Sequence, residues 1–358
     1  MRNLIIITGV RPQYMKASAL LYELDKKIDR DLIRVIDVGQ HYDQNLSDNI
    51  ITELGLKIDF KIRHFQTSTV EIIANSLLQI EQYLKKQEIE KPIFVVFGDA
   101  NPAIIGSILG LKLGGSIVHI EAGARRNCQE QEHCNSKIID CIADLRLCVT
   151  QRAYDCLEKE SLSDGSILTG DMAYNWYKSQ IITKTNFNEH PKILITLHRA
   201  ENTNENGQEI FDNIVNAIEK ASLTAVWINH PRANKFLSKH FNNPIIKIKE
   251  PLTFLSLIQE LNNCSFVLTD SGGVAREAHY LKKPILMRRD IGGWQELKAM
   301  EVLKNVDYQI NDLLDGFEWA KQKQSCYPSD NIFYVEGGIE KGINAIINLL
   351  NSKGNRYV

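Results

Sequence analysis

The stretch that decides the fold reads Phe266-Val267-Leu268-Thr269-Asp270-Ser271-Gly272-Gly273-Val274-Ala275-Arg276-Glu277. Its apolar start predicts a buried strand, and the residues after the glycine pair predict a helix. The free N–H groups at the start of that helix, unhindered by side chains at Gly272 and Gly273, suit a phosphate. A plain strand-to-helix turn, in which Ser271 caps the helix and the glycines only permit tight packing, is an equal alternative.

The same alternation of a short β-branched strand and a helix-length segment runs along most of the chain. It predicts an α/β fold of two doubly wound Rossmann-like domains, with the site in the cleft between them at the carboxyl ends of the strands. We expect a first domain at 1–172 and a second at 173–337, with a boundary near 172–190, and a C-terminal helix at about 338–358 that packs back on the first domain. The predicted strands are Leu4–Thr8, Arg34–Val38, Ile93–Phe97, Ser116–Ile120, Lys192–Leu197, Ala225–Asn229, Ile245–Ile248, Phe266–Thr269 and Pro284–Met287.

The composition narrows the classes of partner. The chain has 358 residues, with 42 Lys and Arg against 44 Asp and Glu, so its net charge of −2 gives no electrostatic attraction to nucleic acid or an anionic membrane. The longest apolar runs, Leu4–Thr8 and Pro92–Phe97, fall far short of the ~20 residues that cross a bilayer. The apolar region at the N-terminus is too short for a secretory signal, so we expect a cytoplasmic protein.

The seven cysteines are odd in number and contain no C-x-x-C pair. His133 adjoins Cys134, but the spacings of the cysteines match no zinc signature. We therefore expect no disulfides and no metal site, and we interpret the cysteines as buried small apolar residues.

A basic segment follows the first strand and reads Gly9-Val10-Arg11-Pro12-Gln13-Tyr14-Met15-Lys16. Pro12 suits the first turn of a helix, and Arg11 and Lys16 are placed to reach an anion. The G-x-G-x-x-G fingerprint is absent here and after every other predicted strand, which disfavours a nicotinamide- or flavin-dependent dehydrogenase. A solvated basic turn is the alternative interpretation.

Carboxylates and imidazoles gather at three other strand ends, which contain Asp99, Glu121 and His198. Acid/base chemistry is built from such groups at the carboxyl ends of parallel strands. Asp99 and Glu121 follow neighbouring strands, so we expect them to face one another and to share or trade a proton. Taken singly, each acid is better explained as a helix cap or a surface residue, but their joint placement shifts the balance towards the catalytic interpretation.

Taken together, these segments resemble the UDP-N-acetylglucosamine 2-epimerase family, and its non-hydrolysing branch most. Gly9-Val10-Arg11-Pro12 and Lys16 resemble G-T-R-P-E-x-x-K, and Gly39-Gln40-His41 and Gly98-Asp99 resemble G-Q-H and G-D-T. The further matches are His119-Ile120-Glu121-Ala122-Gly123-Ala124-Arg125 to H-V-E-A-G-L-R, Thr196-Leu197-His198-Arg199-Ala200-Glu201-Asn202 to T-x-H-R-R-E-N, and Asp270-Ser271-Gly272-Gly273 with Glu277 to D-S-G-G-x-x-E-E.

The resemblance implies a glycosyltransferase-B-like fold, a homodimer and a role in polysaccharide precursor biosynthesis. It implies inversion at C2 of a UDP-linked 2-acetamido hexose, through elimination and re-addition of UDP, with the UDP-sugar as partner and no cofactor. Asp99, Glu121 and Glu132 are assigned to acid/base chemistry and His198 to the leaving diphosphate or to proton transfer. The residues assigned to the nucleotide sugar are Arg11, Lys16, His230, Ser271, Gly272, Gly273 and Glu277. The residues assigned to a second, activating substrate molecule are Gln40, His41, Gln44 and Gln66. They are equally well explained as ordinary polar residues of loops.

The chain also departs from the family pattern. Gln131-Glu132-His133-Cys134-Asn135-Ser136 keeps only the first acid of P-E-E-x-N-R, in a shortened loop, which makes Glu132 the least secure assignment. Arg276 replaces an acid, and Trp294 stands where the family has an Arg, so we expect an altered hexose pocket. Three activities therefore stay open: epimerisation, a hydrolysing variant that releases UDP and free sugar, and a non-catalytic nucleotide-sugar-binding protein or glycosyltransferase on the same fold.

Overall fold

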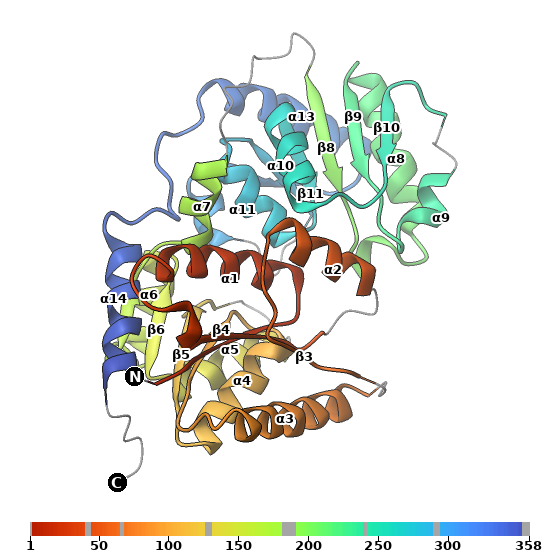
Figure 1. Cartoon of the computed structure of the whole chain (residues 1–358). Coiled ribbons are helices and arrows are strands. Elements are labelled where there is room, and N and C mark those ends of the chain that lie inside the picture. Colours follow the sequence, from red (N-terminus) through yellow and green to blue (C-terminus); the bar gives the residue numbers. More distant parts are fainter. Residues whose placement is uncertain are drawn as a thin grey trace. The chain divides into compact units, whose positions relative to one another are not determined.

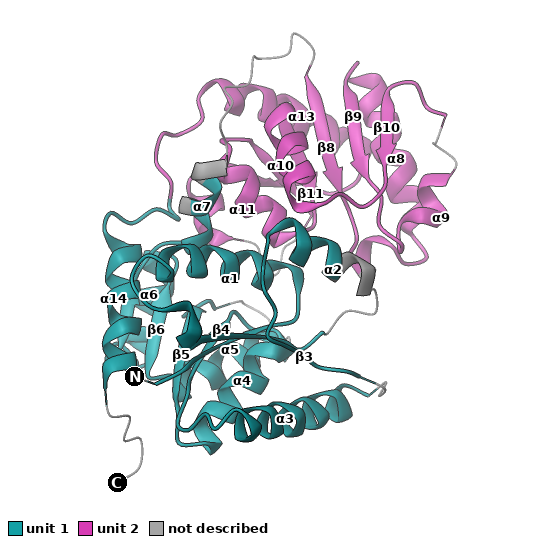
Figure 2. Cartoon of the chain, in the orientation of Figure 1, with its two compact units in different colours: residues 1–182, 332–358 teal, residues 183–331 magenta. Residues whose placement is uncertain are grey.

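The computed structural model describes residues 2–39, 44–64, 68–125, 131–180, 191–238, 242–288 and 294–352. The chain divides into two compact units, the first made of residues 1–182 and 332–358 and the second of residues 183–331 (Figure 2). Each unit is a parallel sheet covered by helices, which confirms the predicted fold class. Among the described residues, no helix is long and apolar enough to cross a membrane.

The sheet of the first unit has the strand order β3-β2-β1-β4-β5-β6-β7, and all its neighbours pair in parallel. Its strands are β1 (Leu4–Thr8), β2 (Ile33–Asp37), β3 (Phe60–Lys61), β4 (Ile93–Phe97), β5 (Ser116–Ala122), β6 (Leu145–Cys148) and β7 (Ser166–Leu168). Its helices are α1 (Arg11–Leu24), α2 (Gln44–Glu53), α3 (Thr69–Lys86), α4 (Asn101–Lys112), α5 (Gln131–Ile142), α6 (Gln151–Lys159), α7 (Met172–Gln180) and α14 (Gly338–Asn351), with a 3-10 turn at Arg30–Leu32.

Both faces of this sheet are apolar, because successive side chains of a strand point to opposite sides. Leu4 and Ile6 of β1 pack into a core with α1 and α14, whereas Ile5 and Ile7 pack into a second core with α3, α4 and α5. Helix α14 contributes Ile343 to the first of these cores and lies beside β6 and β7 (Figure 1). The last described helix of the chain therefore completes the first unit.

The second unit repeats the architecture with the strand order β10-β9-β8-β11-β12-β13, again all parallel. Its strands are β8 (Lys192–Thr196), β9 (Thr224–Ile228), β10 (Ile246–Lys249), β11 (Phe266–Thr269), β12 (Ile285–Met287) and β13 (Leu303–Asn305). Its helices are α8 (Gly207–Lys220), α9 (Asn234–Leu237), α10 (Phe254–Asn263), α11 (Gly272–Tyr280), α12 (Gln295–Ala299) and α13 (Ile310–Ser325), with a 3-10 turn at Ala200–Asn202. One core packs α8 and α13 against β8, β9 and β11 around the buried Trp227.

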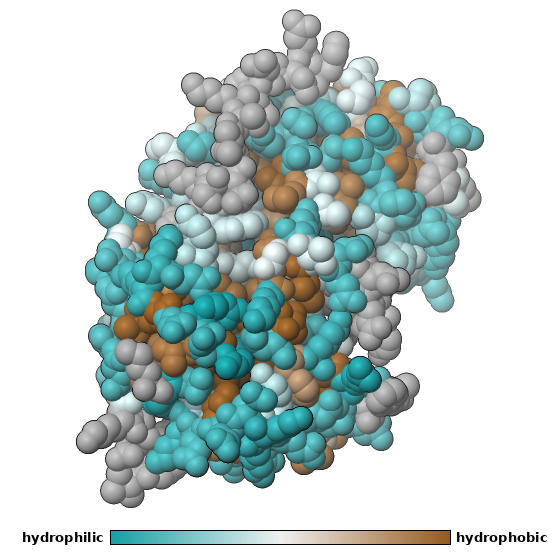
Figure 3. Space-filling view, viewed as in Figure 1, coloured by the Kyte–Doolittle hydropathy of each residue, from teal (hydrophilic) through white to brown (hydrophobic). Residues whose placement is uncertain are grey.

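The larger exposed apolar side chains are spread over several helices of the described chain. They include Tyr22 on α1, Val70 and Leu78 on α3, Ile138 on α5 and Leu255 on α10. On the face drawn in Figure 3, hydrophobic residues alternate with hydrophilic ones in both units. Scattered exposure of this kind is normal for a folded surface.

Candidate active site

The strand order reverses between β1 and β4 in the first unit, and this is the point where such sheets bind ligands. Arg11 follows β1, and Asp99 follows β4. Glu121 lies near the end of β5, the neighbour of β4. The topology therefore brings Asp99, Glu121 and Arg11 together at the carboxyl ends of neighbouring strands in one sheet.

Glu121 lies in an irregular part of β5, where the pairing with β6 shifts between Ile120 and Ala122. Its φ of +69° is left-handed, a conformation that side chains disfavour and that a bulge can impose. Its carboxylate, which is largely buried, forms an ion pair with Lys16 of α1. The bulge and the ion pair together fix the direction of the side chain.

The loop of Asp99 lies directly beside Glu121. A Cβ added at Gly98, whose φ is +62°, would lie 3.2 Å from Oε2 of Glu121. Asn135 of α5 donates from Nδ2 to the backbone carbonyl of Asp99 over 2.9 Å. Asp99 and Glu121 are thus carried by adjacent segments, as predicted, while Glu132 lies exposed in the first turn of α5.

Arg11, at the start of α1, carries a buried Nη2 that has no hydrogen-bond partner in the described part of the chain. An unpartnered guanidinium nitrogen is costly unless a ligand supplies the acceptor. This observation favours an anion site over a solvated basic turn.

In the second unit the strand order reverses between β8 and β11, and His198 and Asp270 follow these strands. The fully buried Asp270 carboxylate accepts hydrogen bonds from the backbone N–H groups of His198 and Arg199, each at 2.9 Å, and from Asn202. It also contacts Nδ1 of His198 at 3.0 Å. Burial alone would raise the pKa of the Asp270 carboxyl, but these donors outweigh it and hold the pKa below its ordinary value.

His198 is therefore oriented through its Nδ1 contact with Asp270. Its ring lies 5.4 Å from that of His230, which follows β9. The backbone N–H of Arg232 donates to Nδ1 of His230 over 3.2 Å. Burial, followed by the charges of His198 and Arg232, lowers the pKa of His230, so its neutral ring offers Nε2–H as a donor.

Helix α11 begins at the glycine pair, as predicted. Ser271 is its N-cap and accepts from the N–H of Val274 at 3.4 Å, and Glu277 is almost fully buried one turn further along. The indole N–H of Trp294 donates to the carbonyl of Gly272 over 2.9 Å, and the guanidinium carbon of Arg276 lies 5.8 Å from the Trp294 ring centre. Trp294 thus lines the start of α11, where the sequence predicts the diphosphate.

The predicted second site lies mostly outside the described residues. Gln40, His41 and Gln66 are not described, and Gln44 is described only as the first residue of α2. Its role as an activating site stays a prediction.

The interpretation of the cysteines as buried residues is wrong for three of them. Cys134, Cys141 and Cys326 are exposed, whereas Cys148 and Cys264 are buried. Cys134 and Cys141 fall seven residues apart on α5, whose core-facing side is already taken by Ser136, Ile139 and other residues. Two helical turns therefore place both thiols on the outer face.

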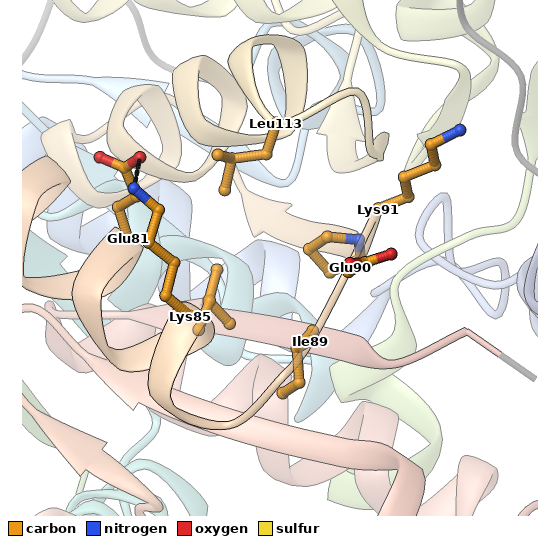
Figure 4. Close-up of a pocket in the computed structure, with 8 residues that line it drawn as sticks. Glu81, Lys85, Ile89, Glu90, Lys91 and Leu113 are labelled. Carbon is orange, nitrogen blue, oxygen red and sulfur yellow. Dashed lines mark ion pairs between the residues drawn. The ribbon is translucent and has the colours of Figure 1, made fainter.

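A pocket in the first unit lies near the amino end of β4, whereas the candidate site lies at the carboxyl ends of the strands (Figure 4). It is bounded by the ends of α3 and α4 and by Pro92, which precedes β4, and Glu81 and Lys85 pair at its rim over 2.7 Å. Asp99 follows the other end of β4, so this pocket does not belong to the candidate site.

Sequence reasoning missed the buried Asp140 of the first unit, and it missed that Asp270 of the second unit orients His198. Asp140 lies on the buried side of α5 with Asn135, Ser136 and Ile139. Polar residues at helical spacing within a core-facing stripe were the signal that could have found it.

Comparisons with known proteins place the chain in one family. A family model described as UDP-N-acetylglucosamine 2-epimerase matches residues 25–348. A Methanococcus maripaludis protein named UDP-N-acetylglucosamine 2-epimerase homolog is 31% identical over 319 residues, covering 82% of this chain and 85% of that protein. A Pseudomonas aeruginosa protein named UDP-2,3-diacetamido-2,3-dideoxy-D-glucuronate 2-epimerase is 30% identical over 308 residues, with coverage of 82% and 85%. The crystal structure of Methanocaldococcus jannaschii UDP-GlcNAc 2-epimerase in complex with UDP-GlcNAc and UDP is 27% identical, with a TM-score of 0.82 and coverage of 98% of this chain and 100% of that one.

Proposed function

Because the chain belongs to the UDP-N-acetylglucosamine 2-epimerase family, whose members are isomerases, we propose that it inverts C2 of a UDP-linked 2-acetamido hexose without releasing the sugar. The observation that carries the proposal is the meeting of Glu121, paired with Lys16, and the Asp99 loop at the carboxyl edge of the first sheet. Two acids on adjacent segments suit a reaction that removes a proton from one face of C2 and adds a proton to the other.

The elimination begins when a carboxylate takes the C2 proton. The C1–C2 double bond forms, the C1–O bond breaks, and its electron pair leaves with UDP, which gives a 2-acetamidoglycal. UDP then adds back to C1 while a proton reaches the opposite face of C2. Asp99, Glu121 and Glu132 supply the acid/base groups.

The leaving UDP must stay bound if it is to return. Positive and N–H donors at the diphosphate stabilise the charge that develops there. We assign this role to His198, oriented by Asp270, to His230, to the first N–H groups of α11 and to Arg11, whose Nη2 lacks a partner in the described chain. Glu277 is assigned to the ribose hydroxyls, and the resemblance further supports a homodimer. We also propose that the protein acts in the cytoplasm, because its N-terminal apolar region is too short for a secretory signal.

The hexose is N-acetylglucosamine or a derivative of it. Trp294 and Arg276 line the start of α11 with an aromatic face and a positive charge, and a relative that is 30% identical is named for a diacetamido glucuronate. Both substrates therefore belong in the assay.

The test is incubation with UDP-N-acetylglucosamine and with UDP-2,3-diacetamido-2,3-dideoxyglucuronate in deuterated water, followed by NMR at C2. Deuterium in intact UDP-sugar of both C2 configurations is the expected result. Deuterium only in free sugar would mean a hydrolysing enzyme, and no exchange with either substrate would leave a binding protein or a transferase. Asp99→Asn and Glu121→Gln should abolish exchange while UDP still binds, whereas Glu81→Gln, at the pocket near the amino end of β4, should exchange normally.

A further inference from the structure

We propose that Asp140 is a positioning residue whose single carboxylate fixes both segments that carry Asp99 and Glu121. The kinetic effect expected of Asp140 rests on the proposed epimerase reaction. The hydrogen bonds of Asp140 are independent of that reaction. Asp140 lies in α5, and its side chain is fully buried. It acts through other residues.

The first connection runs through His119 to the Asp99 loop. Nδ1 of the fully buried His119 lies 2.7 Å from Oδ1 of Asp140, and its Nε2 lies 2.9 Å from the carbonyl oxygen of Gly98. A carbonyl can only accept and an ionised carboxylate can only accept, so both ring nitrogens of His119 donate. The ring is held at both ends and fixes the residue before Asp99.

The second connection runs to the turn after Glu121. Oδ2 of Asp140 accepts from the backbone N–H of Gly123 at 3.1 Å and from Nη1 of Arg125 at 2.6 Å. Gly123 has a left-handed φ of +76°, which glycine adopts readily, whereas the φ of +69° at Glu121 is disfavoured. The carboxylate therefore anchors the backbone two residues after the strained one. Without this anchor the bulge would relax and turn the Glu121 side chain.

Helix α5 makes a third connection. Asn135, about one turn before Asp140, donates to the backbone carbonyl of Asp99. The carbonyl of Gly98 is bound by His119, which Asp140 holds, so two successive carbonyls of this loop are tied to α5. Glu132 lies in the first turn of the same helix. The buried side of one helix therefore holds the Asp99 and Glu121 segments, and the same helix carries Glu132.

The charges in this network balance. His119 and Arg125 face Asp140, and Arg125 also binds Glu160 through Nε at 2.8 Å and Nη2 at 2.5 Å. Burial by itself would raise the pKa of the Asp140 carboxyl, but the charges and hydrogen bonds of His119 and Arg125 keep the pKa below its ordinary value. The ionised carboxylate, on which the first two connections depend, is thus the stable form.

The test compares Asp140→Asn with Asp144→Asn. Asp144 follows α5 and accepts from the N–H of Ile117 at 2.7 Å, at the amino end of β5 and far from the acids along that strand. Steady-state kinetics should show a loss of about a hundredfold in kcat for Asp140→Asn, because misplacing a catalytic group by about an ångström costs that much in rate. The dissociation constant of UDP should change by less than about threefold. Asp144→Asn should keep kcat even if it melts at the same lowered temperature. Asp140→Glu, which keeps the carboxylate, should recover part of the loss.

A spectroscopic measurement on ¹⁵N-histidine-labelled protein separates the network from the reaction. His119, assigned by comparison with His119→Gln, should show two ring N–H protons, and the one on Nδ1 should be lost or displaced in Asp140→Asn. Equal losses of kcat in Asp140→Asn and Asp144→Asn, or an unchanged His119 signal, would overturn the positioning role. If wild-type protein gives no exchange at all, the proposed reaction fails, and the His119 signal still decides the network.

Discussion

The backbone of Glu121 is held in a conformation that is disfavoured for residues with a side chain, and this conformation sets the direction of its carboxylate. Its φ of +69° costs on the order of 1 kcal/mol or more relative to an extended residue. The Lys16 ion pair and the hydrogen bond from Gly123 to Asp140 hold the segment in place. The strain is localised at one of the proposed acid/base residues.

Gly98→Ala tests the close approach between the Asp99 loop and Glu121. Its φ of +62° makes alanine unfavourable by about 1 kcal/mol, and the new methyl group would stand 3.2 Å from Oε2 of Glu121. We expect at least a tenfold loss of C2 exchange. Gly114→Ala is the matched control, because its φ is +63° and a Cβ there meets nothing within 4 Å. Chemical denaturation should show similar stability losses, and full activity of Gly98→Ala would contradict the assigned contact.

At the scale of elements, the start of α11 combines a structural and a binding role. Ser271→Ala should cost about 1 kcal/mol of stability through loss of the cap. We also expect weaker UDP binding by calorimetry, because the first N–H groups of the helix lose their alignment. Thr253→Ala removes the equivalent cap of α10, in the same unit, where Thr253 accepts from the N–H of Ser256 at 3.3 Å. The site assignment is wrong if both variants bind UDP alike.

Elements with strong apolar patterns could be predicted from the sequence, and short or irregular ones could not. β1, β4 and β11 begin and end where predicted, because each is a fully buried apolar run. β3 has only Phe60 and Lys61, too few residues for a pattern, and β5 runs two residues past the predicted Ile120 because a bulge carries it on. Within the site, residue types at strand ends located the acids. The four donors of Asp270 could not be predicted, because they lie about 70 residues away in sequence.

At the scale of the whole molecule, the second unit should lose stability in mild acid. Burial, the largest cause, lowers the pKa of His279 to about 4, and Nδ1 of this residue lies 2.8 Å from the hydroxyl of Tyr327. In the unfolded chain His279 binds a proton near pH 6.5, whereas in the folded chain it does so only near pH 4. The contribution of neutral His279 to the free energy of unfolding is therefore complete above about pH 6.5. It falls by roughly 3 kcal/mol as the pH drops towards 4. Urea unfolding between these pH values should show a flatter pH dependence for His279→Gln. Identical slopes would show that another group is responsible.

The C-terminal helix ties the first unit together. Ile346 of α14 is fully buried in the core that also contains Leu4 and Ile6. Ile346→Ala should destabilise the first unit by about 2–5 kcal/mol. Hydrogen exchange should then show faster opening of β1, β6 and β7, while the amides of β8 and β11 keep their protection. Uniform loss of protection in both units would contradict this assignment.

This return of α14 has a consequence for the order in which a nascent chain can mature on the ribosome. The segment 1–182 emerges first, yet the core to which α14 contributes stays incomplete until the whole of Thr183–Asn331 has been translated. The second unit is continuous in sequence, so all of its residues are available before the last helix of the first unit has been made.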